Sequence, residues 1–221
     1  MEQVSGKGMD YPHEKYTGNC KAKSIILHTF TKKKMPLHSY FVLTAFALLI
    51  VVFIVQTARM RGEGFELVGK PSIEKYYFFS GKLTLFTTWV LFCIKAAVPK
   101  LGYIHLPFYL NWFAVAMLWA GVLVVLMATV SLGKSLRIGI PQTQTALYTR
   151  GIYHLSRNPL YLGVFAIATG SCLYFPDLIN VSFAIYGIYT HHQIIKGEEQ
   201  FLNTRFGKEW ESYAANVRRY L

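Results

Sequence analysis

The stretch "FYLNWFAVAMLWAGVLVVLMATVSL", residues 108–132, contains no charged side chain over its whole length. At a helical rise of about 1.5 Å per residue, it is long enough to cross a hydrocarbon core about 30 Å thick. A backbone in lipid must satisfy its own hydrogen bonds, which a helix does. We therefore predict a transmembrane helix whose early aromatic residues lie at the membrane–water interface: Phe108, Tyr109 and Trp112.

Two similar segments precede this one. No charge interrupts "SYFVLTAFALLIVVFIVQTA", residues 39–58. The second segment, residues 76–98, contains Lys82 and Lys95 toward its two ends, where long side chains can extend to the headgroups. Together with the stretch above, these segments predict transmembrane helices 1 to 3 within residues 36–132.

A helical hairpin is predicted further along the chain. Between Arg157 and Lys196 the only charged residue is Asp177, which follows Pro176. This turn divides the apolar run into legs of about sixteen and eighteen residues, each short for an upright span, so the legs should pack as a tight hairpin. Small residues allow close backbone packing: Gly163, Gly170, Ser171 and Gly187. The predicted fold class is an all-α, polytopic membrane bundle of about five transmembrane helices.

These segments divide the chain into three parts. Residues 1–35 form a polar, basic tail, residues 36–132 hold helices 1 to 3, and residues 133–221 hold a loop, the hairpin and a C-terminal tail. The first part lacks the short apolar core of a cleaved signal peptide. Five spans put the two chain ends on opposite sides, and more Lys and Arg lie on the C-terminal side, although the KKK at 32–34 opposes this. The pattern favours a multi-pass membrane protein with a cytoplasmic C-terminus.

The composition also indicates the partners. Hydrophobic residues make up 53% of the chain, charged residues 15%, and the net charge is +12. The basic residues are spread between apolar runs and form no nucleic-acid motif, so we predict membrane lipids and no nucleic acid as partners. The three cysteines form no C-x-x-C pair, which predicts neither a zinc site nor a disulfide framework. The oligomeric state stays open.

The polar C-terminal part contains two patterns. Five apolar residues recur at helical spacing and predict an amphipathic C-terminal helix that lies on the membrane or folds over the preceding loop: Leu202, Phe206, Trp210, Tyr213 and Val217. Glu198 and Glu199 are adjacent, so on a helix one could meet a ligand while the other pairs with an arginine, namely Arg157, Arg218 or Arg219. A solvated helix face is the alternative. His191 and His192 point apart on a helix, and no metal site is predicted.

Two segments carry a resemblance to a known family. "LYTRGIYHLSRNPLYLG", residues 147–163, is followed after one hairpin by "EEQFLNTRFGKEWESYAANVRRYL", residues 198–221. Together they resemble the core of the isoprenylcysteine carboxyl methyltransferase and phospholipid methyltransferase superfamily, over about residues 130–221. The resemblance implies a membrane-embedded methyltransferase that uses S-adenosylmethionine. It also implies a cofactor held between the loop and the C-terminal tail, and a lipophilic substrate that enters from the bilayer.

The resemblance also implies a set of site residues. It places five side chains in the cofactor pocket, with help from the backbone of Leu147 to Gly151: Tyr153, Asn158, Tyr161, Glu198 and Glu199. Asn158 stands where the family usually has histidine, and an amide offers neutral hydrogen bonds but no protonated ring. Arg157 is expected to orient an acceptor carboxylate. Glu198 or Glu199 would serve as the base if the acceptor must lose a proton.

Several functions remain open at this point. The preferred prediction is carboxyl O-methylation of an isoprenylcysteine-like substrate. The alternatives are N-methylation of a phospholipid amine, S-methylation of a small thiol, an NADPH-dependent lipid or sterol reductase with a similar motif, and a membrane scaffold without activity. The acidic pair and the short chain favour the methyltransferase over the reductase. For Arg157, anchoring of a phosphate headgroup is the alternative to a role in the reaction.

Overall fold

The computed structural model describes residues 35–62, 69–104, 106–133, 139 and 146–221. Residues 1–34 of the predicted N-terminal tail, and residues 134–138 and 140–145 of the predicted cofactor loop, lie outside these residues. The helices are, in chain order, α2 (Leu37–Gly62), α3 (Lys75–Ala97), α4 (Phe108–Leu132), the short 3-10 helix η3 (Gly151–His154), α5 (Pro159–Tyr174), α6 (Leu178–Phe206) and α7 (Lys208–Asn216).

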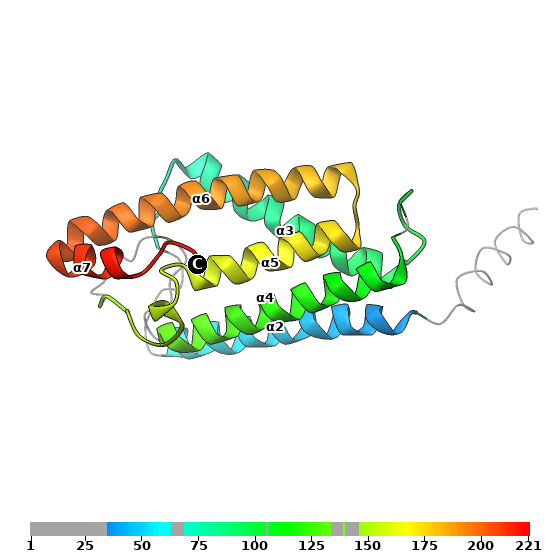
Figure 1. Ribbon diagram of the computed structural model, residues 1–221, viewed down its shortest axis with the longest axis horizontal. Helices are drawn as coiled ribbons and strands as arrows, with labels where there is room; N and C mark the ends of the chain where they lie inside the picture. Colours follow the sequence, from blue (N-terminus) through cyan, green and yellow to red (C-terminus); the bar gives the residue numbers. More distant parts are fainter. Residues whose placement is uncertain (1–34, 63–68, 105, 134–138, 140–145) are drawn as a thin grey trace, which may run out of the picture. The chain divides into compact units, whose positions relative to one another are not determined.

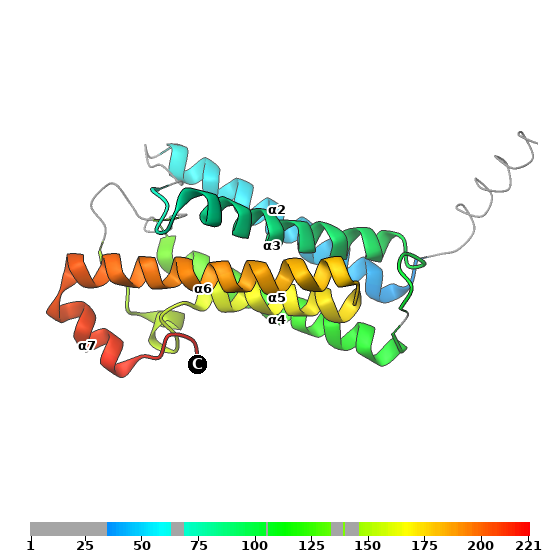
Figure 2. The same ribbon diagram turned by 90° about the horizontal axis from the view of Figure 1, so that it is seen from above.

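Five of these helices run in alternating directions within one compact unit, residues 36–221 (Figure 1). Helix α4 packs most extensively against α5, and α3 packs against α6, while α2 contacts both α3 and α4. Figure 2 shows the long helices side by side from a second direction. One end of the bundle therefore carries the end of α4, η3, the start of α5 and the end of α6.

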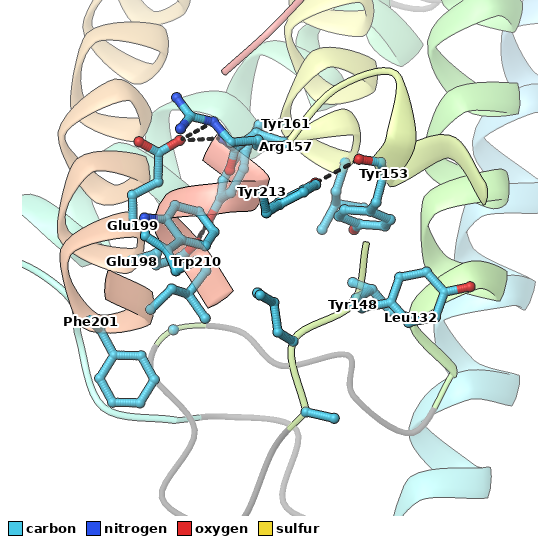
Figure 3. Close-up of a pocket in the computed structure, with 16 residues that line it drawn as sticks. Leu132, Tyr148, Tyr153, Arg157, Tyr161, Glu198, Glu199, Phe201, Trp210 and Tyr213 are labelled. Carbon is cyan, nitrogen blue, oxygen red and sulfur yellow. Dashed lines mark hydrogen bonds and ion pairs between the residues drawn. The ribbon is translucent and has the colours of Figure 1, made fainter. Parts of the chain in front are cut away.

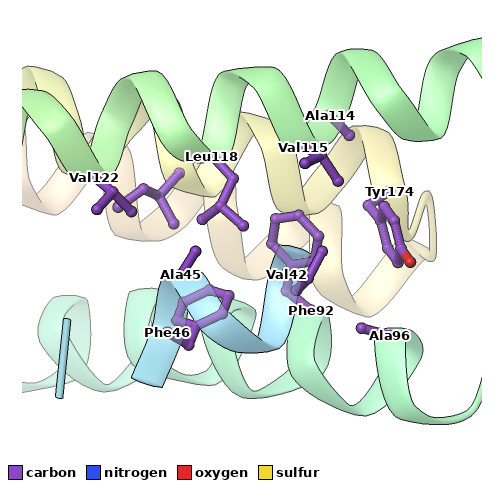
Figure 4. Packing of buried hydrophobic residues seen from close by; sticks show 11 residues of the cluster. Val42, Ala45, Phe46, Phe92, Ala96, Ala114, Val115, Leu118, Val122 and Tyr174 are labelled. Atoms are coloured by element: carbon purple, nitrogen blue, oxygen red, sulfur yellow. The ribbon is translucent and has the colours of Figure 1, made fainter. Parts of the chain in front are cut away.

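The core between these helices is apolar. Val42 of α2, Phe92 of α3, Leu118 of α4 and Ile167 of α5 are each 0% exposed and belong to one cluster (Figure 4). In contrast, many large apolar side chains of α2 face outward, such as Phe53, which is 56% exposed. An outer surface of this kind suits hydrocarbon and not water.

Three of the described helices are long and apolar enough to cross a membrane: α2, α3 and α4. The all-α membrane bundle predicted from the sequence is confirmed. Helix α5 is apolar but has only 16 residues. Its partner α6 has 29 residues, because the predicted second leg continues past Lys196 as a polar helix that reaches Phe206. The hairpin is therefore present, with a longer second leg than predicted.

The hairpin turn is built by polar groups that cap the two helices. The carboxylate of Asp177 accepts a hydrogen bond of 3.0 Å from the backbone N–H of Ile179, which is a helix N-cap interaction. The amide of Asn180, 0% exposed, donates to the carbonyl oxygen of Phe175 over 2.8 Å. Both contacts satisfy backbone groups that a helix end leaves unpaired.

The stripe of five apolar residues does not form one helix: two residues lie on α6, two lie on α7, and Val217 follows the end of α7. Gly207 adopts a φ of +50°, which side-chain-bearing residues rarely adopt, and it ends α6. The chain then turns into α7, where Trp210 is buried. The hydroxyl of Tyr213 donates a 2.6 Å hydrogen bond to the carbonyl oxygen of Tyr153 in η3. The C-terminal helix therefore folds over the loop, as one of the two predicted alternatives had it.

Helices α4 and α5 approach closely at two glycines, and a side chain there should destabilise the fold. A Cβ atom at Gly163 would lie 2.7 Å from the carbonyl oxygen of Gly121 and 2.9 Å from the backbone nitrogen of Val125. Since both neighbours are backbone atoms, Gly163→Ala should cost about 1–3 kcal/mol of stability. Thermal unfolding in detergent measures this loss. Gly62→Ala, at a position with open space, is the matched control, and equal melting temperatures for the two variants would contradict the expectation.

Candidate active site

A pocket of about 160 Å³ lies at the end of the bundle where α4 ends and α5 begins (Figure 3). The end of α4, the segment 146–148, η3, α5, α6 and α7 all contribute to its walls. Most of the site residues predicted from the sequence line it: Leu147, Tyr153, Arg157, Asn158, Tyr161, Glu198 and Glu199. Leu147 and Glu199, which are 52 positions apart in the sequence, thus meet in one pocket.

Gly151 is the predicted residue that does not line the pocket. It begins η3 with a φ of +62°, and a Cβ atom there would lie 3.2 Å from the hydroxyl oxygen of Ser131. This glycine therefore sets the direction in which the chain enters the site. Its predicted help in cofactor binding stays a prediction.

Glu199 is fully occupied by partners from this chain. Its Oε2 accepts two hydrogen bonds from the guanidinium of Arg219, over 3.0 Å and 2.8 Å. Its Oε1 accepts a 2.9 Å hydrogen bond from the amide of Asn158 and lies 3.5 Å from Nε of Arg157. Charge-assisted bonds of this kind fix a carboxylate in place and neutralise it. The predicted pairing of one acid of the pair with an arginine is present.

Glu198 is in the opposite situation. Both of its carboxylate oxygens accept from the hydroxyl of Tyr161 over 3.0 Å, and no ion pair joins it to the described residues. Burial raises the pKa of Glu198 to about 7, a rise that the Tyr161 hydrogen bond and the charge of Lys82 oppose and that Glu199 reinforces. The pocket therefore contains one acid that forms no ion pair with the described residues, and Lys82 acts on it from beyond ion-pair distance.

Asn158 shows why an amide can stand at the usual histidine position. Its Nδ2 donates to Oε1 of Glu199 over 2.9 Å and to the carbonyl oxygen of Arg219 over 3.3 Å. Two donors on one nitrogen thus join α5, α6 and the C-terminal segment, whereas a neutral imidazole has one donor in total. In this chain, Asn158 holds Glu199 in place.

Asn158→Asp should loosen this junction. The variant removes both N–H donors and puts a carboxylate oxygen beside Oε1 of Glu199, so we expect a loss of at least about 2 kcal/mol of stability. Thermal unfolding in detergent measures the loss. Asn203→Asp, at an exposed position of α6, is the control for the change of charge. An unchanged melting temperature in Asn158→Asp would show that the junction does not contribute.

The C-terminal segment closes one side of the site. The backbone N–H of Arg157 donates to the carbonyl oxygen of Arg218 over 3.0 Å. The hydroxyl of Ser156 donates to the carbonyl oxygen of Arg219 over 3.2 Å. The hydroxyl of Tyr220 is hydrogen-bonded to Nδ1 of His192 over 2.7 Å. His192 thus holds the C-terminal segment against α6.

The side chain of Arg157 is held less tightly than that of Glu199. Its guanidinium lies 5.6 Å from the ring centre of Trp210, and its Nε is buried without a hydrogen bond to the described residues. The side chain is 14% exposed and lines the pocket. A guanidinium that keeps free donors beside a pocket can bind a carboxylate or a phosphate in a forked geometry.

Aromatic residues that the sequence analysis did not assign complete the lining: Tyr148, Phe201, Trp210 and Tyr213. Burial raises the pKa of Tyr213 to about 12 and raises that of Tyr153 as well. Both phenols therefore stay neutral near pH 7. The sequence spacing of Trp210 and Tyr213 did not identify them as pocket residues, because an apolar stripe on a helix has the same pattern whether it packs or lines a pocket.

The fold and the pocket together define a polytopic membrane protein with a charged, aromatic-lined site at one end of its helices. Residues 109–209 match the model of a family described as phospholipid methyltransferase. The match starts in α4 and extends into α7, so it includes α5 and both glutamates. It confirms the resemblance to the integral membrane methyltransferases and indicates a membrane methyltransferase. No curated protein and no solved structure matches the chain significantly.

Proposed function

We propose that this protein transfers a methyl group from S-adenosylmethionine to a lipophilic acceptor, and that the acceptor is the carboxylate of an isoprenylcysteine-like molecule. The observation that carries the first part is Glu198, a carboxylate in the pocket that Tyr161 contacts and that forms no ion pair with the described residues. A ligand with a positive charge balances it. The aromatic faces of Tyr148, Tyr153 and Trp210 around it suit a cationic ligand as well.

S-adenosylmethionine fits this set of residues because it has an ammonium group and a methylsulfonium, and when bound it supplies an activated methyl group. Glu198 would hold a positive group of the cofactor. The aromatic residues would keep water out and position the ligand, which is the main contribution that an enzyme makes to an in-line displacement. Glu199, occupied by Arg219 and Asn158, would keep the wall of the site rigid.

The guanidinium of Arg157, whose Nε makes no hydrogen bond to the described residues, supports a carboxylate acceptor. An ionised carboxylate is already nucleophilic, so it needs orientation and no base. In the transfer, one carboxylate oxygen would form a bond to the methyl carbon while the bond from that carbon to sulfur breaks. The electron pair of the broken bond would stay on sulfur. The family match supports a phospholipid amine as the second candidate. Such an amine must lose a proton, and Glu198 would accept it.

We further propose that the acceptor enters from the bilayer and that the active site and the C-terminus face the cytoplasm. The apolar outer surfaces of α2 and α3 support a position within lipid. The larger number of Lys and Arg on the C-terminal side of the spans supports the orientation.

Binding of S-adenosylmethionine to the detergent-solubilised protein tests the proposal directly. Calorimetry with S-adenosylmethionine, with S-adenosylhomocysteine and with NADPH should show binding of the first two and none of the third. S-adenosylmethionine should bind more tightly than S-adenosylhomocysteine, because only S-adenosylmethionine has the sulfonium charge. Selective binding of NADPH would favour the reductase, and no binding of any of the three ligands would favour the scaffold without activity.

The affinity for S-adenosylmethionine should also depend on pH. Because burial raises the pKa of Glu198 to about 7, the ionised fraction falls as the pH is lowered through that value. We expect binding at pH 6 to be about fivefold weaker than at pH 7. Calorimetry between pH 5.5 and 7 measures this slope, and Glu198→Gln should remove it. A slope that survives in the variant would assign the titration to another group.

A further inference from the structure

A second cavity lies at the end of the bundle opposite the candidate active site, where α2 and α4 begin and where α3 and α5 end. Its volume is about 160 Å³. Four of its lining residues are polar, and each comes from a different helix: His38, Lys95, Asn111 and Tyr174. Polar side chains that converge from four helices of a membrane bundle mark a candidate binding site, because such residues are rare in membrane helices and are mostly functional.

Lys95 is the main charge of this cavity. It is only 7% exposed, so the predicted extension of its side chain to water does not occur. Its ammonium donates hydrogen bonds to the carbonyl oxygens of Pro99 and Leu101, over 2.9 Å and 2.5 Å. These two acceptors leave one of its three N–H groups available. Among the described residues no carboxylate lies within ion-pair distance, so none of them balances its charge.

The other polar groups are held in fixed positions beside this charge. Nδ1 of His38 is hydrogen-bonded to the hydroxyl of Tyr174 over 2.7 Å, and the hydroxyl of Ser39 contacts the same phenol over 3.1 Å. The His38 ring also packs edge-on against Phe108 and Trp112, at 6.1 Å and 6.2 Å between ring centres. The cavity therefore combines a cation and neutral donors with the aromatic residues typical of a membrane interface.

We propose that this cavity binds the phosphate group of a phospholipid at the membrane face opposite the active site. A phosphate monoanion supplies the negative charge that the described residues do not offer to Lys95, and its oxygens accept from Lys95, Asn111 and Nε2 of His38, the ring nitrogen that Tyr174 leaves free. Phospholipid headgroups are the most abundant anions where helices of this length end. This site is independent of the proposed methyl transfer, so either proposal can fail without the other.

Lipid retention and thermal stability test this site together. Native mass spectrometry of the protein from phosphatidylglycerol nanodiscs should show one retained phospholipid per chain, and Lys95→Gln should lower its occupancy about tenfold. Lys95→Arg keeps the charge and Lys100→Gln removes an exposed charge nearby, so both should retain the lipid. In delipidated protein, short-chain phosphatidylglycerol should raise the melting temperature and diacylglycerol, which has no phosphate, should not.

Three results would overturn the proposal. Equal lipid retention in Lys95→Gln and the wild type would exclude a role for the lysine. Equal stabilisation by diacylglycerol and phosphatidylglycerol in the wild type would exclude recognition of the phosphate, even if Lys95→Gln failed to fold. Stabilisation by inorganic phosphate but not by short-chain phosphatidylglycerol would assign the cavity to a free anion and not to a lipid.

Discussion

Glu198→Gln should reduce the affinity for S-adenosylmethionine by on the order of 100-fold, and methyl transfer should fall at least as much. The amide has nearly the shape of the carboxylate and can still accept from the hydroxyl of Tyr161. The change therefore removes the negative charge and leaves the contacts. Calorimetry for the cofactor and a methyl-transfer assay on membranes measure the two effects.

The same variant should not be less stable than the wild type. The pKa of Glu198 is higher in the folded protein than its ordinary value of 4.5, so its ionisation disfavours the folded state as the pH rises from that value through about 7. Removing the ionisable group should keep or raise the melting temperature at pH 8. Glu209→Gln, at an exposed position of α7, is the matched control. Unchanged cofactor affinity in Glu198→Gln would refute the assignment of this acid.

Arg157→Ala should abolish turnover, with a loss of about 100-fold or more, while membrane insertion and cofactor affinity change little. The reason is that its guanidinium lines the pocket, makes no side-chain hydrogen bond at Nε to the described residues, and would orient a carboxylate acceptor. Glu199 should stay in position, since Arg219 and Asn158 hold it with shorter contacts than Arg157 makes. Turnover with a prenylated cysteine analogue and separate cofactor calorimetry check both halves of this expectation.

Two further variants make the test of Arg157 sharper. Arg157→Lys keeps the charge but loses the forked geometry, so it should recover only a small part of the turnover. Arg205→Ala removes an exposed arginine of α6 and should be silent. Retained turnover in Arg157→Ala would refute the role in the reaction and favour the headgroup-anchoring alternative.

Much of the fold could be predicted from the sequence because it depends on patterns that lipid imposes. The charge-free stretches predicted α2 and α4 nearly to their ends, and Pro176 with Asp177 marked the hairpin turn. The pairing of one acid of the Glu198–Glu199 pair with an arginine followed from the geometry of a helix. Signals of this kind are local, so they need no knowledge of which helices touch.

What could not be predicted depends on contacts between distant segments. Trp210 and Tyr213 fit a packing stripe as well as a pocket wall, and only the turn at Gly207 places them over η3. Lys95 has the sequence context of a lysine that reaches water, but the loop after α3 folds back and offers it two carbonyl oxygens. Both features depend on the folded positions of separate segments, which the local sequence pattern does not determine.

The attachment of the C-terminal segment to α5 and α6 has a consequence for biosynthesis. Arg219 and Tyr220, which hold Glu199 and His192, are translated after all the described helices. A nascent chain whose helices have already entered the membrane therefore lacks one wall of its pocket until residues 217–220 have left the ribosome. The pocket should then take its final shape only after this segment has folded back onto α5 and α6.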